Sequence, residues 1–520
     1  MKSRYWIIGW LVIVTIFLSI IGRCVYKVDP YFHFHKPDTE KYYYTLDNQR
    51  SQNDGICKHF DYDALITGTS MTENFKTSEF DELFNVNSIK VPFSGGTYKE
   101  INDNLRRALE SNKRLKLVVR CLDYGRFWDD PDSMRSDLGQ YPTYLYDNNP
   151  FNDVNYLFNR DVIFNRTYQM MADNVEGVIP GITSFDVYNN WQKLYTFGVD
   201  SVCPDGISYT DIGSSTHLTE DEKVMLEKNI QKNVIELADL YPDVEFYYFF
   251  SPYSAVWWEN ITMTGDIYKQ LEAEKYLIET ILEHDNIYLF SFNNRTDIIT
   301  DLNNYKDSVH YGEWINSLIL RWMYDGKYLL TKDNYLDYLE EEYDYYTKFD
   351  YNILNGQIDY ESDFYAAALL NEELTDEKPI DLLNDSRVYL SNAEIKEDEL
   401  ECVGTLQRDM YDPQELGEYL LENYIGAKIE VSHVGGHRYL AFNGRKVSGT
   451  GEPNVYVYDA DSNIVGIVSD DYSNLDNEWH QYVIDLSSVE GMITIIFNGA
   501  YLDSTGDSES IYQFENIILY

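Results

Sequence analysis

Three residues of this chain, Ser70, Asp307 and His310, are of the types that make up a nucleophilic triad. Ser70 follows a short apolar run in the segment ITGTSMTENF, and Asp307 and His310 stand three positions apart in the segment DSVH. An imidazole held by a carboxylate can take the proton of a serine hydroxyl, which makes that serine a nucleophile toward acyl carbonyls. Taken singly, Asp307 could be a plain helix cap and His310 a surface residue. The combination, serine first and Asp-x-x-His last, predicts acyl chemistry.

Elements of a parallel sheet would have to position these residues. Five short, nearly continuous apolar runs are typical of strands buried on both faces, and helical patterns separate them. The runs are residues 63–67, 88–93, 115–122, 244–250 and 286–292, and the helical patterns are 97–111, 219–240, 267–283 and 308–323. Alternating strands and helices predict a three-layer, doubly wound α/β domain of flavodoxin-like type over residues 61–330.

The predicted topology brings the two motifs to one edge of the sheet. Ser70 comes at the carboxyl end of the first strand, and ligands of open α/β sheets gather at that edge. Asp307 and His310 come after the fifth strand, at the start of an expected helix, where residues three apart share a face. We therefore expect His310 to reach both Asp307 and Ser70.

These blocks resemble the SGNH/GDSL hydrolase superfamily, and more closely its surface proteins that modify cell-wall polymers or exopolysaccharides. Such proteins include the D-alanyl-lipoteichoic acid transfer proteins and alginate-type O-acetyltransferases. The resemblance covers roughly residues 60–325, with Gly68-Thr69-Ser70 at the nucleophile block and Asp307-x-x-His310 at the last block. It implies an acyl intermediate on Ser70, an extracellular polysaccharide substrate, a membrane-bound O-acyltransferase as a partner, and no cofactor or metal.

The resemblance also implies where an oxyanion would bind. The family's oxyanion glycine falls on Gly95 or Gly96, in the segment FSGG after the second run. A backbone N–H there, together with that of Ser70, would stabilise a tetrahedral oxyanion. A Gly-Gly pair after a strand is also an ordinary turn, so both interpretations stay open.

The third block departs from the family pattern. Where the family offers an Asn, this chain has Asp123, in the segment RCLDY. An ionised carboxylate cannot donate to an oxyanion. Either Asp123 is protonated, or it positions another group such as Arg126, or the site is weak. Arg126 and Tyr311 are the candidate substrate-binding residues.

The C-terminal part, residues 401–520, has a different texture. Short β-rich runs separated by Gly, Asn, Asp and Ser predict an antiparallel β-sandwich. Residues 478–486 and 514–519 resemble carbohydrate-binding jelly rolls. Aromatic side chains that would serve as sugar platforms, or equally as core, are Tyr439, Tyr456, Tyr458 and Trp479. A non-catalytic surface protein that keeps an SGNH scaffold and binds glycan is therefore the alternative to an enzyme.

The N-terminus predicts a membrane anchor over residues 1–27. Trp6–Gly22 is an uncharged apolar stretch that is marginally long enough to cross a bilayer. No small-x-small cleavage site follows it; Arg23, Cys24 and Lys27 come instead, which favours an uncleaved anchor over a signal peptide. We expect a single-pass protein of the cell membrane with the bulk of the chain extracytoplasmic.

The remaining segments and the composition complete the prediction. Residues 28–60 would be a connector, 125–218 an insertion forming a wall or lid, and 331–400 an acidic, Tyr-rich linker that is either helical or a solvated spacer. A net charge of −47 argues against nucleic-acid binding. Five widely spaced cysteines give little support to a zinc site or a disulfide framework.

Overall fold

The structure is a computed structural model that forms two compact units, residues 1–358 and 359–520. In the first unit it describes residues 2–137, 140–210 and 216–357. In the second unit it describes residues 359, 362, 365–366, 369–370, 373, 380–396, 399–404, 413–424, 426–432, 439–448, 452–468, 479–486, 489, 491–501 and 510–519.

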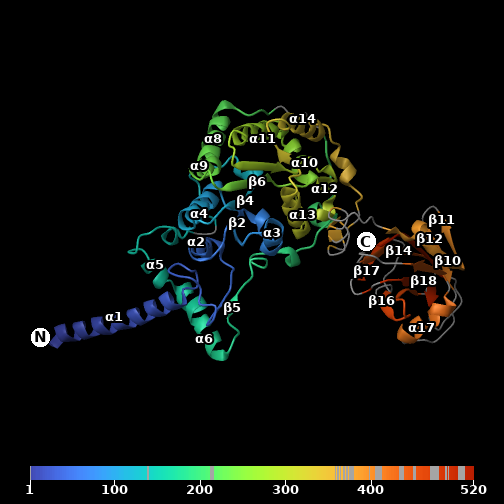
Figure 1. The fold of residues 1–520 in the computed structure, drawn as a ribbon, viewed down its shortest axis with the longest axis horizontal. Coiled ribbons are helices and arrows are strands. Elements are labelled where there is room, and N and C mark those ends of the chain that lie inside the picture. Colours follow the sequence, from blue (N-terminus) through green and yellow to red (C-terminus); the bar gives the residue numbers. More distant parts are fainter. Residues whose placement is uncertain are drawn as a thin grey trace. The chain divides into compact units, whose positions relative to one another are not determined.

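A six-stranded sheet forms the centre of the first unit (Figure 1). Its order is β3 (Ser88–Pro92), β2 (Ala64–Gly68), β4 (Leu117–Leu122), β6 (Glu245–Phe250), β7 (Ile287–Ser291) and β8 (Leu329–Leu330). The first five strands are parallel, and β8 runs antiparallel to β7. Numbered along the chain, the parallel strands have the order 2-1-3-4-5, which is the flavodoxin-like arrangement. The prediction of a parallel sheet from the five apolar runs is confirmed.

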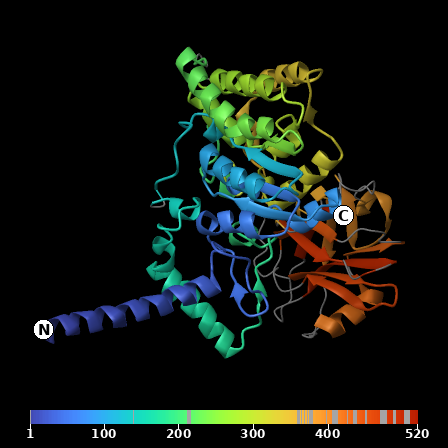
Figure 2. The same cartoon turned by 60° about the vertical axis from the view of Figure 1, so that its left-hand side comes forward.

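Helices connect and cover these strands (Figures 1 and 2). The helices around the sheet are α2 (Gln49–His59), α3 (Thr77–Phe84), α4 (Tyr98–Ser111), α8 (Glu220–Ile230), α9 (Glu236–Leu240), α10 (Ala255–Met263), α11 (Ile267–Ile281), α12 (Thr296–Thr300), α13 (Glu313–Tyr324) and α14 (Tyr335–Tyr346). α2 packs against α4 and β3, while α3 packs against α13. Local sequence fixes several helix starts: Thr97 and Glu100 form a reciprocal capping box at α4, and Thr219 and Glu222 form one at α8.

Residues 125–218 form mostly short elements. They are α5 (Val154–Leu157), a π-helical segment (Val162–Tyr168), α6 (Gln169–Glu176), β5 (Gly181–Ile182) and α7 (Val199–Val202). β5 pairs in parallel with β1 (Tyr43–Tyr44), so the insertion is tied to the segment that precedes the sheet.

The predicted connector, residues 28–60, and the first part of the Tyr-rich segment 331–400 belong to the packed first unit. The segment 28–60 contains α2, whose residues Gln52, Asn53 and Ile56 are buried. The Tyr-rich segment after residue 330 begins with α14, which packs on α11 and buries Tyr338 and Tyr346. Neither segment is a solvated spacer over these residues.

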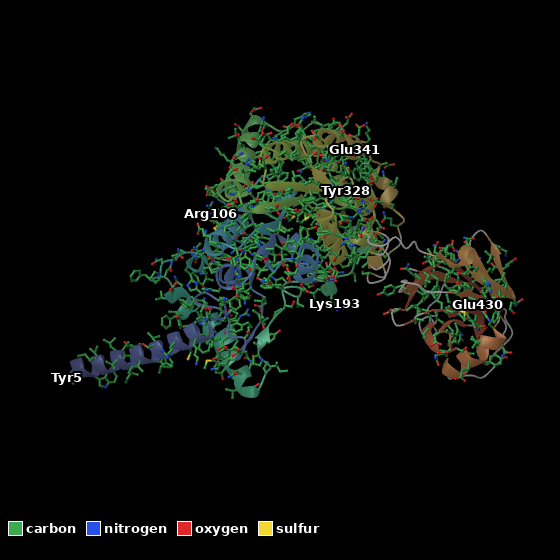
Figure 3. The ribbon with its side chains drawn as sticks, in the orientation of Figure 1. Tyr5, Arg106, Lys193, Tyr328, Glu341 and Glu430 are labelled. Carbon is green, nitrogen blue, oxygen red and sulfur yellow. The ribbon has the colours of Figure 1, made fainter. Side chains whose placement is uncertain are left out.

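The helix α1 (Lys2–Val28) is apolar from Tyr5 to Val28, with a mean hydropathy of 2.3 in its most apolar window. It is long and apolar enough to cross a membrane, a property that a signal sequence shares. Figure 3 shows Tyr5 near the end of α1 that lies away from the rest of the first unit. At the opposite end, Val25 joins a buried cluster that consists of Tyr31, Leu145, Tyr156 and Val162.

The second unit contains two antiparallel sheets. One has the order β10 (Arg387–Ser391), β13 (Gly426–Val431), β18 (Ile493–Tyr501), β15 (Glu452–Tyr458) and β16 (Ile464–Val468). The other has the order β11 (Ala393–Lys396), β12 (Glu399–Gly404), β19 (Ser510–Leu519), β14 (Tyr439–Ser448) and β17 (His480–Asp485), with β9 (Ile380–Asp381) also paired to β19. Residues of both sheets, such as Ile429 and Phe442, share one buried cluster. The predicted sandwich is therefore present, and its strands begin at residue 380 rather than after 401.

Two of the four candidate sugar platforms are core residues of this unit. Tyr456 and Tyr458 are buried beneath Leu416 and Leu420 of helix α17 (Pro413–Asn423). Trp479 lies beside Arg445, whose guanidinium carbon is 4.3 Å from the indole centre. Tyr456 and Tyr458 thus stabilise the fold, and they are not available for stacking on a sugar.

Candidate active site

Ser70 lies at the carboxyl end of the central strand β2, as the topology predicts. It begins a 3-10 turn, Ser70–Thr72, for which the Thr69 side chain is the cap. Gly68 makes the sharp exit from the strand: its φ is +154°, and a Cβ there would lie 2.7 Å from Thr72 Cγ2 and 2.9 Å from Cys121 Cβ. A residue without a side chain is needed at this position. The turn therefore presents the Ser70 hydroxyl above the sheet edge.

The side chain of His310 meets that hydroxyl. Ser70 Oγ and His310 Nε2 are 2.8 Å apart, although the residues are 240 positions apart in the chain. On the other side of the ring, His310 Nδ1 is 2.8 Å from Asp307 Oδ2 and 2.9 Å from Oδ1. The structure thus joins all three residues in one chain of hydrogen bonds.

Asp307 and His310 lie in a turn, not in the helix that the sequence predicts. The Asp307 carboxylate accepts hydrogen bonds from the backbone N–H groups of Val309 and His310, and Lys306 N–H donates to the His310 carbonyl. These bonds close a loop before α13 begins at Glu313. The local carboxylate-to-backbone bonds compete with helix formation here, which is the physical reason for the late start.

The environment of Asp307 favours its ionised form. Partial burial opposes ionisation, but hydrogen bonds and charge from His310, together with a hydrogen bond from Lys306, hold the pKa of Asp307 well below its usual range. Lys306 Nζ lies 2.7 Å from Asp307 Oδ2 and above the rings of Trp191 and Tyr195. An ionised Asp307 fixes the tautomer of His310, so that Nε2 faces the serine as a proton acceptor.

The two glycines proposed for the oxyanion site differ in the state of their N–H groups. Gly96 N–H donates to the carbonyl of Phe93 at 2.7 Å and is therefore used by the turn. Within the part of the chain that the structure describes, no protein acceptor is found for the N–H of Gly95 or of Ser70. Gly95 has φ +58° and lies against the Arg135 guanidinium. The structure leaves Gly95, and not Gly96, with a donor free for an oxyanion.

Asp123 is a hydrogen-bond acceptor beside the turn that carries Ser70. Its carboxylate accepts hydrogen bonds from the hydroxyls of Thr69 at 2.5 Å and Tyr253 at 2.6 Å, and the residue is buried. It therefore braces the turn that carries Ser70 and donates nothing to an oxyanion.

Arg126 and Tyr311 do not reach the cavity at the triad. Arg126 pairs with Asp129 at 3.4 Å, so Asp123 does not position it. Tyr311 is buried, with its hydroxyl 3.2 Å from Ser251 Oγ. Neither residue lines the cavity that contains Ser70 and His310.

A cavity of about 1030 Å³ opens over Ser70 and His310. One wall comes from the segment before the sheet, through residues 47–51, and another from the insertion, through residues 189–191 and 194–195. Cationic groups at its surface are Arg50, Arg135 and Lys306, and anionic groups are Asp47, Glu73 and Asp161. The expectation that residues 125–218 contribute a wall over the functional edge agrees with this lining.

Three residues of the cavity escaped the sequence interpretation: Lys306, Trp191 and Glu73. Trp191 lies edge-on to the His310 ring, with ring centres 5.6 Å apart. Burial raises the pKa of Glu73, and this effect is opposed by a hydrogen bond from Gln49 and by the charges of His310 and Lys90. Lys306 directly precedes Asp307 in the chain, and this proximity is the one signal in the sequence that could have pointed to it. Nothing in the sequence linked Trp191 to His310.

Comparisons with known proteins add little to this geometry. No family model and no curated protein matches the chain. Among solved structures, it is similar to a structure described as "CBM4 structure and function" at 12% identity, covering 28% of this chain and 94% of that chain, with a TM-score of 0.18. The module CsCBM6-3 from Clostridium stercorarium in complex with cellobiose matches at 10% identity, covering 26% and 91%, with a TM-score of 0.16. A family two carbohydrate esterase from Cellvibrio japonicus matches at 11% identity, covering 28% and 34%, with a TM-score of 0.16. Likenesses at this level carry no argument about function.

Proposed function

We propose that this chain is a membrane-anchored, extracytoplasmic serine esterase or O-acyltransferase of the SGNH type. The observation that carries the proposal is the hydrogen-bonded chain Ser70–His310–Asp307 at the mouth of a large cavity. A hydroxyl, a base and an orienting carboxylate in this order are the parts that nucleophilic acyl transfer requires. The 2-1-3-4-5 parallel sheet supports the three-layer scaffold expected of that superfamily.

The proposed reaction has two steps. Ser70 Oγ attacks the carbonyl carbon of an acyl ester while His310 Nε2 takes the hydroxyl proton, and the oxyanion is held by the N–H groups of Ser70 and Gly95. The alkoxide leaving group departs with the proton from His310, and an acyl-serine remains. In the second step, water or a sugar hydroxyl gives its proton to His310 while its oxygen bonds to the acyl carbon. The bond from that carbon to Ser70 Oγ then breaks, and His310 returns the proton to Ser70 Oγ.

Polysaccharide is the proposed acceptor or substrate polymer. The cavity presents aromatic side chains, Tyr144, Trp191 and Tyr195, together with hydrogen-bonding groups such as Gln140 and Asn190. Aromatic faces combined with polar groups suit a sugar ring, which has apolar faces and a hydroxyl rim. The membrane-bound O-acyltransferase partner and the sugar-binding role of the second unit rest on the resemblance alone.

A fluorophosphonate probe tests the nucleophile. The full chain in detergent should be labelled on one peptide that contains Ser70, and both Ser70→Ala and His310→Ala should abolish labelling. Ser111→Ala, which changes an exposed serine at the end of α4, is the matched control and should label as wild type does. Equal labelling of wild type and Ser70→Ala would refute the assignment.

One observation favours the non-catalytic alternative. Asp123 occupies the place of the family's oxyanion Asn and accepts hydrogen bonds from two hydroxyls, so it supplies no donor to an oxyanion. Hydrolysis of an acetylated oligosaccharide separates the hypotheses. Turnover that depends on Ser70 establishes the enzyme. Glycan binding without turnover, unchanged in Ser70→Ala, would establish the binding protein.

A further inference from the structure

The insertion presents an exposed apolar surface beside the end of α1. On the π-helical segment and α6, Phe164, Tyr168, Met171 and Val175 recur at spacings of four, three and four residues and are between 38% and 85% exposed. Further exposed apolar residues lie before and after them: Phe151, Val154, Phe158, Val178 and Ile179. We call these nine residues the apolar stripe. Water-soluble surfaces rarely expose so many large apolar side chains together.

The apolar stripe is continuous with α1. Both α5 and the π-helical segment contact α1. Gly22 of α1 faces Phe158, and a Cβ at Gly22 would lie 3.6 Å from the Phe158 ring. In Figures 1 and 2, the helical run formed by the π-helical segment and α6 passes across the C-terminal end of α1. With α1 across a bilayer, a helical run that passes its end in this way would lie along the bilayer surface.

The length of α1 sets the level of this crossing. The residues from Tyr5 to Cys24 form a helix about 30 Å long, which is the thickness of a hydrocarbon core. Val25 and Val28 are already covered by protein. The bilayer surface therefore falls near Gly22, at the height of Phe158.

The charges around this level suit lipid headgroups. Arg23 and Lys27 are exposed on the last turns of α1, and Arg160 is exposed between α5 and the π-helical segment. Basic side chains next to an apolar helix face are typical of helices that lie in a membrane interface. Acidic side chains lie on the same segment, with Asp161 and Glu176 exposed, so the local charge is mixed.

We propose that the apolar stripe lies in the interfacial layer of the bilayer that α1 crosses. The occupant of this surface is lipid, and a second copy of the chain or another protein is excluded by the proposal. The inference goes beyond the proposed chemistry and does not depend on it, but it requires α1 to stay attached and to span the membrane.

Spin-label accessibility on the full chain in lipid vesicles tests the proposal. Cys24→Ser and Cys203→Ser remove the two partly exposed thiols, since the other three cysteines are buried. Nitroxide labels are then placed at Met171→Cys and Val175→Cys on the stripe, and at Gln169→Cys and Glu176→Cys as controls at exposed polar positions of the same helix. Collisions are measured with oxygen, which concentrates in lipid, and with a neutral nickel chelate, which stays in water.

The expected result is an oxygen-to-nickel collision ratio several-fold higher at the two stripe positions than at the two controls. Labels at Met171 and Val175 that collide with nickel as freely as the label at Gln169 would overturn the proposal. Labels shielded from both reagents would also overturn it, because protein and not lipid would then cover the stripe. The intact mass of the vesicle-bound chain must include α1, and loss of these residues refutes the premise.

Discussion

At the scale of single residues, the site is a chain of polar side chains arranged around the imidazole of His310. Asp307 holds one ring nitrogen, Lys306 holds Asp307, and Ser70 faces the other nitrogen. Each of these contacts has a separate function, so each can be tested by a substitution that keeps the shape of the side chain.

Asp307→Asn tests the orienting carboxylate. The amide cannot stabilise an imidazolium and favours the wrong tautomer, so we expect turnover of an acetyl ester to fall by about 10²–10⁴-fold with the fold intact. The measurement is the steady-state rate, with circular dichroism as the check on folding. Asp301→Asn, a nearby carboxylate that caps a 3-10 turn, is the control and should stay near the wild-type rate. An unchanged rate in Asp307→Asn would remove Asp307 from the mechanism.

Lys306→Met tests a positioning residue. Loss of a charge-assisted hydrogen bond to Asp307 should lower kcat by roughly tenfold, since such bonds contribute about 1.5–3 kcal/mol. Lys306→Arg retains the charge and should recover most of that loss, which a purely structural role would not explain. The comparison of kcat and KM for the three proteins decides the matter. A change in KM alone would instead make Lys306 a substrate-binding residue.

The sequence predicts the triad but not its surroundings. Ser70, Asp307 and His310 stand in short segments whose spacing carries information. Lys306 reaches Asp307 as its neighbour in the chain. Trp191 reaches His310 only because the insertion folds back over the site, and no local pattern encodes that contact. Arg126 and Tyr311 lie close in the chain to Asp123 and His310, yet neither lines the cavity, because side chains of neighbouring residues point in different directions.

At the scale of elements, the sequence does not predict α2, because several of the residues that this helix buries are polar. The inward face of α2 is polar: the Gln52 amide bonds to backbone groups of residues 45, 47 and 48, and Asn53 Nδ2 donates to the Pro92 carbonyl. A helix packed through such bonds has no hydrophobic period. The five parallel strands were predictable for the opposite reason, because they are apolar on both faces.

A buried carboxyl pair between α11 and α14 makes the stability of the first unit depend on pH. Glu274 and Glu342 are fully buried, and each lies 3.1 Å from the Tyr338 hydroxyl. Tyr124 donates a hydrogen bond to Glu274, and Asn293 donates one to Glu342. The Ser291 hydroxyl is hydrogen-bonded to that of Tyr338. Burial raises the pKa of Glu342 to about 7 and that of Glu274 well above its usual value.

Glu342→Gln should flatten the pH dependence of stability. A carboxyl with a raised folded-state pKa stabilises the protein fully below its unfolded pKa, and this contribution is lost as pH rises toward about 7. The wild type should lose up to about 3 kcal/mol from this group between pH 4.5 and 7, and the variant should not. Denaturant unfolding at several pH values checks the slope. The control is Glu341→Gln, whose exposed carboxyl lies next to Glu342 in the chain and should leave the slope unchanged.

At the scale of the whole chain, α1 is part of the fold as well as a candidate membrane span. Its last turn buries Val25 and Val28. The carboxylate of Asp29, directly after it, accepts hydrogen bonds from the backbone N–H groups of residues 33–35. A chain cut at the predicted end of the anchor would lose contacts that the α/β unit uses.

Two shortened chains test this role. A form that begins at Arg23 keeps both valines, whereas a form that begins at Asp29 lacks them and should be less stable by about 3 kcal/mol. Thermal unfolding of the two purified forms provides the comparison. Val25→Ala in the longer form should reproduce part of the loss, and Lys27→Ala, at an exposed position, should not. Equal stability of the two forms would show that α1 contributes nothing to folding.

The burial of Val25, Val28 and Asp29 means that no flexible linker joins α1 to the domain that carries Ser70. With α1 in the bilayer, Ser70 would lie at a fixed distance from the membrane surface. Under the proposed function, the enzyme would modify only those stretches of polymer that pass close to the lipid, and it would leave the outer layers of a thick envelope untouched. A flexible spacer inserted between α1 and the rest of the first unit would change where along the polymer the modification falls, without any change in the chemistry.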